Sequence, residues 1–192
     1  MTSPTLSVVV STFGKSCKAK LANRAASGAP EDQLRAPLER LFQELTTLVG
    51  LPDAAVTLVG ESALGALATR PDYAVAVLNA LVGFIEVKAP GKGANPHRFT
   101  DEHDKKQWLK LKSLPNLLYT DGNSFSLWRD GQMIDKIVEL EGDVETAGAK
   151  LAAPATLLPL IADFLRWRPE PPARSSSSPK PPRGCAVCCA TK

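Results

Sequence analysis

The sequence predicts an α/β fold in which a mixed central sheet is flanked by helices. The predicted elements follow one another in the order helix, strands, helix, strands, helix. The longest apolar stretch, residues 74–85, is interrupted only by Asn79 and Gly83 and has the pattern of a tight hairpin. With 192 residues, of which 44% are hydrophobic, the chain can bury one core of ordinary size.

The first strong helix signal covers residues 31–49. Apolar residues recur there at helical spacing, after two acidic residues in the opening turn: Leu34, Leu38, Leu41, Phe42, Leu45 and Leu48. Pro37 falls inside this pattern, so the helix either begins there or is kinked. Residues 1–30 are rich in Ser, Thr, Ala and Lys. We expect them to form an N-terminal arm that adds an edge strand or lies loosely on the domain.

The remaining elements are placed by apolar alternation and by turn residues. A strand is expected at residues 55–61, and a hairpin at 73–78 and 81–88 with its turn at Asn79-Ala80. A loop at 89–96 precedes a polar helix at 101–113, in which Trp108 and Leu111 point inward. Strands at 116–120 and 124–129, an edge strand at 134–140 and a closing helix at 154–167 complete the fold.

From Arg168 the composition changes abruptly to Pro, Ser and Arg. Such a segment has too little apolar surface to fold, so residues 168–192 are expected to be a disordered tail and residues 31–167 the folded domain. The tail holds Cys185, Cys188 and Cys189, and the first two have the spacing of half a zinc site. The chain has only two histidines, both far upstream, so a closed four-ligand zinc site is not predicted.

Charge and hydropathy exclude several classes of protein. A formal net charge of +3 is too small to argue for nucleic acid by itself, although it permits a basic face. No apolar run approaches the roughly 18 residues that a membrane span needs. The first residues lack the basic leader and apolar region of a secretion signal. We therefore expect a cytoplasmic protein with no membrane partner.

Three polar residues stand at one end of the predicted hairpin. Asp72 begins its first strand, and Glu86 and Lys88 end its second. Because strand residues alternate between faces, Glu86 and Lys88 share a face, while Val87 points into the core. Two carboxylates and the Val87 carbonyl could hold Mg²⁺, with the Lys88 ammonium orienting a water or stabilising charge on phosphate. This set has the chemistry of metal-dependent phosphodiester hydrolysis. The alternative is a solvated Glu-x-Lys pair on a strand, but the apolar flanks favour a buried, functional set.

Two motifs carry a resemblance to a known family. They are Arg70-Pro71-Asp72-Tyr73 and Gly83-Phe84-Ile85-Glu86-Val87-Lys88-Ala89-Pro90-Gly91. They resemble the PD-(D/E)xK nuclease superfamily, and more narrowly the N-terminal nuclease domain of single-chain restriction–modification enzymes that carry an adenine-specific DNA methyltransferase. Residues 107–108, 114–122 and 125–131 resemble the same group, and the likeness covers about residues 31–167.

The resemblance implies a restriction-endonuclease-like fold that cuts DNA with Mg²⁺. It assigns metal binding to Asp72 and Glu86 and assistance in hydrolysis to Lys88. A further acidic ligand often comes from a preceding helix or strand, for which Glu39 and Glu61 are the candidates. Gln107 lies on the helix that often faces the substrate, the alternative being an ordinary exposed glutamine.

Basic residues cluster between the motif and the next strand: Lys88, Lys92, Arg98, Lys105, Lys106, Lys110 and Lys112. Such residues can neutralise DNA phosphates, and we expect Lys92, Arg98, Lys105 and Gln107 to contact DNA. The alternative is a solvated helix face, whose charge Asp101, Glu102 and Asp104 partly cancel. No element that reads bases is recognisable.

The chain also departs from the family. It has no Asn-Pro-Pro-Tyr or Asn-Pro-Pro-Phe motif and no glycine-rich cofactor loop. We therefore expect a fragment, truncated or frameshifted near Arg174, whose methyltransferase or specificity module is encoded downstream. Two other hypotheses remain open. One is a nucleic-acid-binding or structural remnant that does not cut, and the other is a purely structural α/β scaffold.

Overall fold

The computed structural model describes residues 4–23, 28–60 and 70–168. Predictions for Glu61 and for the tail from residue 169 onward therefore lie outside the described residues. The elements are α1 (Leu6–Leu21), α2 (Pro30–Leu48), β1 (Val56–Gly60), β2 (Tyr73–Val77), β3 (Ala80–Val87), η2 (Pro96–Arg98), α3 (Glu102–Leu111), β4 (Leu117–Thr120), β5 (Ser124–Arg129), β6 (Gln132–Glu139), η3 (Gly148–Lys150) and α4 (Leu157–Leu165).

The six strands form one mixed sheet in the order β1-β2-β3-β4-β5-β6. Only β3 and β4 are parallel, and every other neighbouring pair is antiparallel. A parallel pair needs a crossover connection, which η2 and α3 provide here. The predicted mixed sheet flanked by helices is confirmed. No helix in the described part of the chain is both long and apolar enough to cross a membrane.

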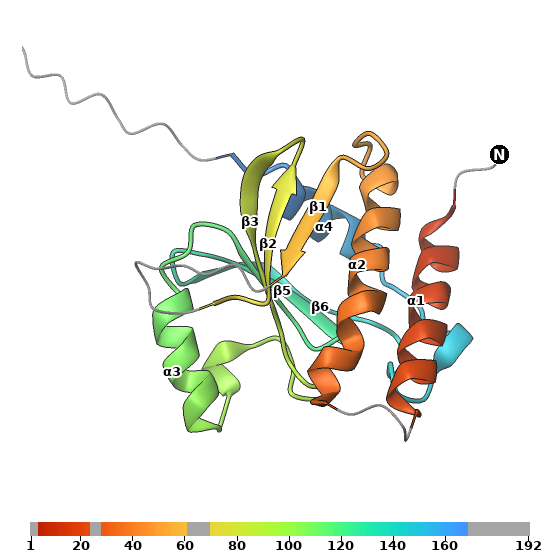
Figure 1. The fold of residues 1–192 in the computed structure, drawn as a ribbon, viewed down its shortest axis with the longest axis horizontal. Helices are drawn as coiled ribbons and strands as arrows, with labels where there is room; N and C mark the ends of the chain where they lie inside the picture. Colours follow the sequence, from red (N-terminus) through yellow and green to blue (C-terminus); the bar gives the residue numbers. More distant parts are fainter. Residues whose placement is uncertain (1–3, 24–27, 61–69, 169–192) are drawn as a thin grey trace, which may run out of the picture.

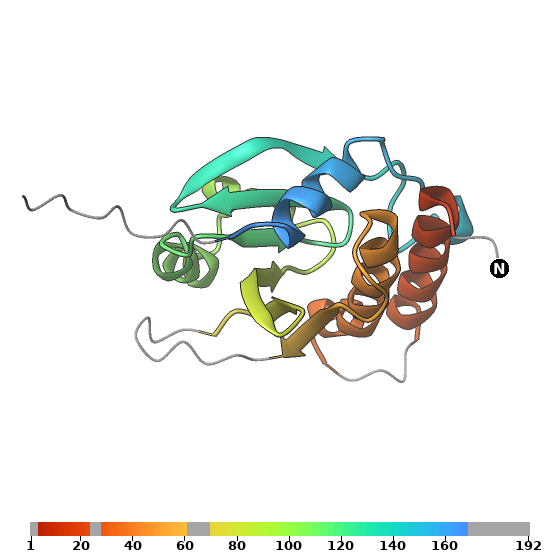
Figure 2. The same cartoon turned by 90° about the horizontal axis from the view of Figure 1, so that it is seen from above.

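The two faces of the sheet are covered by different helices. Figures 1 and 2 show α3 on one side of the strands and α1 and α2 on the other. Strand alternation divides the core in the same way. Tyr73, Ile85 and Val87 belong to the cluster with α1, α2 and α4, whereas Ala74 and Phe84 belong to the cluster with α3.

The β2–β3 hairpin turns one residue earlier than the sequence predicted. Val77 pairs with Ala80, so the loop is Leu78-Asn79 rather than Asn79-Ala80. Both loop residues have positive φ, 50° and 66°. Two-residue hairpins with this backbone match the right-handed twist of the strands, and Asn is among the residues that adopt it readily.

The N-terminal segment contradicts its prediction as an arm. Residues 6–21 form α1, which packs on α2 and buries Val9, Phe13 and Cys17 in the main core. These three follow one another at intervals of four, so they line one face of the helix. Ser, Thr, Gly and Lys residues lie between them, so the apolar face is difficult to recognise from the sequence alone. Gly14 lies so close to η3 that an added Cβ would stand 2.2 Å from the Gly148 carbonyl oxygen.

Pro37 neither starts nor ends α2, which runs from Pro30 to Leu48 with Pro37 inside it. Of the two alternatives for Pro37, a helix that begins there is excluded, and the predicted span of residues 31–49 agrees with α2 to within one residue at each end. The helix instead begins at Pro30. Proline is tolerated at this position, because the N–H groups of the first turn have no acceptor within the helix.

Candidate active site

The candidate site lies where β2 begins and β3 ends, on the side of the sheet that α3 covers. Tyr73 pairs with Ile85 in the β2–β3 register, and one further step places Asp72 opposite Glu86. On the other side of β3, Glu86 pairs with Tyr119 of β4. Asp72, Glu86 and Tyr119 therefore form a row across three neighbouring strands.

The sequence Pro71-Asp72 changes the hydrogen bonding at the end of the β2–β3 ladder. The Phe84 N–H donates to the carbonyl of Asn116, just before β4, at 2.9 Å, and the Lys88 N–H donates to Thr120 of β4 at 2.8 Å. Because backbone groups alternate along a strand, those of Val87 point toward β2. There the Val87 N–H donates to Asp72 Oδ2 at 2.8 Å. The residue that the register places opposite Val87 is Pro71, which has no N–H to donate to the Val87 carbonyl.

Lys88 is the centre of a buried network of ion pairs. Its Nζ donates to Glu86 Oε1 at 3.0 Å, to Asp104 Oδ1 at 2.9 Å and to Gln107 Oε1 at 2.5 Å. The Lys88 and Glu86 side chains are only 7% and 3% exposed, so these charges are largely removed from water. Burial by itself would lower the pKa of Lys88, but the Glu86 and Asp104 carboxylates outweigh it and raise that pKa. Lys88 is consequently a fixed cation at neutral pH.

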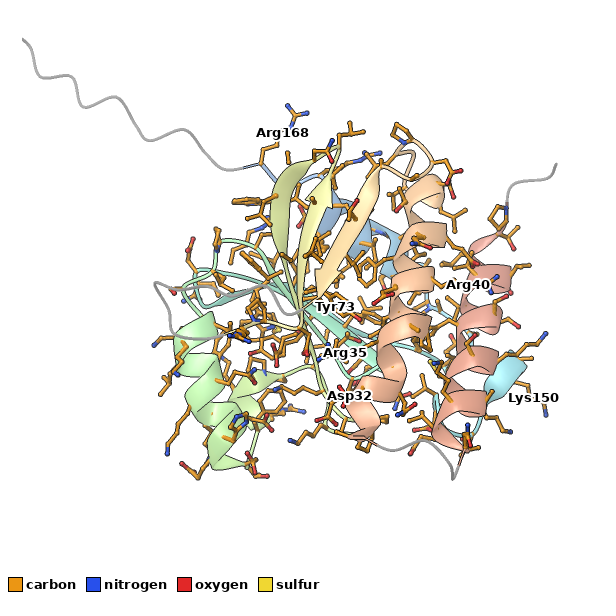
Figure 3. All side chains as sticks on the ribbon, in the orientation of Figure 1. Asp32, Arg35, Arg40, Tyr73, Lys150 and Arg168 are labelled. Atoms are coloured by element: carbon orange, nitrogen blue, oxygen red, sulfur yellow. The ribbon has the colours of Figure 1, made fainter. Side chains whose placement is uncertain are left out.

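Both oxygens of Asp72 are also occupied. Arg35 of α2 donates from Nη2 to Asp72 Oδ1 at 2.8 Å, while Oδ2 accepts from Val87. Figure 3 labels Arg35 and Tyr73, whose ring centre lies 6.0 Å from the guanidinium carbon. Burial raises the pKa of Asp72, and the Val87 N–H and the Arg35 charge only partly oppose that rise.

Glu86 is the most perturbed carboxyl of the set. Burial raises its pKa to about 7, the Asp72 charge adds to the rise, and the Lys88 charge opposes it. Its second oxygen, Oε2, is buried without a hydrogen-bond partner in the described structure. A carboxylate oxygen left unsatisfied in this way costs about 1–3 kcal/mol or more, so this position favours an added cation or donor.

Of the residues that the sequence proposed for DNA contact, two join this network. Gln107 is bonded to Lys88, and Lys92 forms an ion pair with Asp104. Lys105 instead pairs with Glu102 at 2.8 Å, and Arg98 is exposed at the end of η2.

Glu39, a candidate fourth acid, accepts a hydrogen bond from the Tyr73 hydroxyl at 2.9 Å. Tyr73 packs in the core on the α2 side of the sheet, so this bond engages Glu39 away from the α3 face.

Sequence reasoning missed three contributors. No sequence pattern connects Arg35 with the site, and the sequence indicates Asp104 only as a charge that offsets the basic cluster. Asp104 is 4% exposed and stands one helical turn before Gln107, a spacing that could have indicated a shared face. Buried Asp121 fixes the loop after Lys88, because its Oδ2 accepts from Gly91 N at 3.1 Å and Gly93 N at 2.8 Å.

Comparison with known proteins supports the fold. The chain resembles part of a structure titled "cryoEM structure DrdV-DNA complex", with a TM-score of 0.52 and 21% identity. The match covers 84% of this chain and 14% of that chain, so this chain spans a small part of its length. No family model and no curated protein matches the sequence. The predicted class, an α/β restriction-endonuclease-like fold, is confirmed.

Proposed function

We propose that this chain is a Mg²⁺-dependent DNA endonuclease domain that hydrolyses phosphodiester bonds. The observation that carries the proposal is the set of half-buried Asp72 and buried Glu86 and Lys88, in which Glu86 Oε2 has no hydrogen-bond partner in the described structure. DNA as the substrate is supported by the fold shared with DrdV, whose structure is a complex with DNA.

The donor set fits magnesium. Asp72 and Glu86 would hold the ion through carboxylate oxygens, and the Val87 carbonyl, for which Pro71 supplies no N–H, would be a third ligand. All three are hard oxygen donors, which Mg²⁺ prefers over nitrogen or sulfur. When bound, the ion would supply charge neutralisation on the scissile phosphate and a water of lowered pKa.

Each neighbouring side chain then has a definite task. Lys88 stays protonated, so it acts as a cation toward phosphate or the attacking water and not as a general base. Asp104 and Gln107 hold its Nζ from α3. Arg35 fixes the rotamer of Asp72 from the opposite side of the sheet.

The wider context is proposed from the sequence resemblance. We place the domain in a restriction–modification system, in which a methyltransferase or specificity module encoded downstream supplies recognition of the target. Lys92, Arg98, Lys105 and Gln107 are the proposed DNA contacts. Lys105 and Arg98 would act at a distance from the carboxylates, on phosphates flanking the cut.

The test is cleavage of supercoiled plasmid by the purified chain with Mg²⁺. Wild type should nick the plasmid, and Asp72→Ala and Lys88→Ala should abolish nicking. Glu139→Ala, which removes an exposed carboxylate from edge strand β6, should retain it. Wild type that binds DNA without cutting it, in Mg²⁺ and then in Mn²⁺, would refute the proposal and favour the alternative, a non-cleaving member of the fold.

A further inference from the structure

Two buried side-chain polar atoms in the described structure have no hydrogen-bond partner, and they belong to neighbouring residues. They are Glu86 Oε2 and the Tyr119 hydroxyl. Glu86 and Tyr119 are direct partners in the parallel β3–β4 register, so their side chains leave the same face of the sheet side by side. An unsatisfied acceptor and an unsatisfied donor thus lie on adjacent strands, on one face of the sheet.

Packing, and not hydrogen bonding, fixes the position of Tyr119. The residue is 0% exposed, and its ring centre lies 5.9 Å from the ring centres of both Phe99 and Trp108. Lys88 Nζ lies 5.8 Å from the Phe99 ring centre, so this aromatic wall borders the ion-pair network. A rigid phenol held in such a place can direct its single proton with little loss of entropy.

Tyr119 remains a donor in this environment. Burial raises the pKa of its hydroxyl, and the carboxylates of Glu86, Asp104 and Asp72 raise it further. An ordinary phenol is already protonated at neutral pH, and a raised pKa does not change that. Glu86 directs Oε1 to Lys88, while its Oε2 and the Tyr119 phenol have no hydrogen-bond partner in the described structure.

We infer that Tyr119 is a positioning residue for Glu86. The Tyr119 hydroxyl donates a hydrogen bond to the Glu86 carboxylate when that carboxylate holds Mg²⁺. The inference deepens the proposed function and rests on it. Metal-binding carboxylates commonly accept a hydrogen bond that fixes their orientation, and removal of such a partner lowers metal affinity about 10- to 100-fold. Tyr119 is the neutral donor that the strand register places beside Glu86.

The test compares two conservative variants of the full chain, Tyr119→Phe and Tyr73→Phe. Both tyrosines are buried, at 0% and 1% exposure, but the Tyr73 hydroxyl is bonded to Glu39. Mg²⁺ affinity is measured by isothermal titration calorimetry, and melting temperature is measured in EDTA. Tyr119→Phe should bind Mg²⁺ about tenfold more weakly without a lower melting temperature, because it removes an unpaired hydroxyl. Tyr73→Phe should melt at a lower temperature and bind Mg²⁺ within about twofold of wild type.

A kinetic readout separates positioning from general damage. In plasmid nicking, Tyr119→Phe should shift the Mg²⁺ concentration for half-maximal rate about tenfold upward, and saturating Mg²⁺ should restore most of the wild-type rate. Wild-type Mg²⁺ affinity in Tyr119→Phe would overturn the inference while leaving the proposed function intact. So would a fall in melting temperature equal to that of Tyr73→Phe. Wild type that binds no Mg²⁺ would overturn both.

Discussion

Replacement of Glu86 by Gln should stabilise the metal-free chain at alkaline pH and leave its stability unchanged at acid pH. The folded pKa of Glu86 is raised from 4.5 to about 7, so the folded state binds the proton more tightly than the unfolded state. For an acid whose pKa is raised in the folded state, the contribution of that group to stability is fully present below pH 4.5 and is lost as pH rises through 7. At about 1.36 kcal/mol per pH unit, the rise of the Glu86 pKa from 4.5 to about 7 amounts to about 3 kcal/mol.

Gln resembles the protonated carboxyl in shape and charge, so the variant should escape this loss. The two proteins should unfold with similar free energy at pH 4.5. Above pH 8, Glu86→Gln should be the more stable by about 3 kcal/mol. The charges of Lys88 and Asp104 stay constant across this window, because the pKa of Lys88 is raised above 10.5 and that of Asp104 is lowered below 3.8. Asp72, whose pKa burial also raises, is present in both proteins, so the difference between them reports Glu86 together with its coupling to Asp72.

The assay is urea unfolding in EDTA at several pH values between 4.5 and 9, followed by tryptophan fluorescence. Addition of Mg²⁺ should reverse the order at pH 8, since only wild type gains the metal ligand. Asp163→Asn, which removes a carboxylate that pairs with Arg129 and is 46% exposed, is the matched control and should show no such crossing. A stability difference between Glu86→Gln and wild type that does not change with pH would refute the reasoning about burial.

Three further outcomes are expected. Gly14→Ala should lower the free energy of unfolding by about 1–3 kcal/mol in urea titrations, because its Cβ has no room beside η3. Gly60→Ala, whose Cβ would meet nothing within 4 Å, should change it by less than about 1 kcal/mol, and equal losses would contradict this account. Asp104→Asn should slow plasmid nicking about tenfold by loosening Lys88, whereas Glu102→Gln should not, and equal rates would remove Asp104 from the site. Cys17 is buried, and burial raises the pKa of its thiol to about 12, so it should react slowly in the native protein. Cys17→Ala should therefore leave the number of fast-reacting thiols in a native chromogenic assay unchanged. A number lower by one would show that Cys17 is accessible.

Local periodicity predicted much of the fold. The two-residue alternation of β3 correctly put Glu86 and Lys88 on one face and Val87 in the core, since that rule needs no knowledge of other elements. The same approach failed for α1. Its apolar face contains Val9, Phe13 and Cys17, with Ser, Thr and Lys between them. This face can be recognised as part of the core only once α2 and η3 are known to cover it.

The sequence by itself determined which groups form the proposed site: two carboxylates and an amine at one end of a hairpin, with Pro71 directly before Asp72. Only the tertiary structure decided their state. Asp104 and Gln107 reach Lys88 from α3, and Arg35 reaches Asp72 from α2, across separations of 16, 19 and 37 residues. Tyr119 meets Glu86 through the parallel register of β3 and β4. Periodicity cannot specify such pairings, because strand order and helix docking depend on burial of the whole core, and that same burial sets the pKa of Glu86.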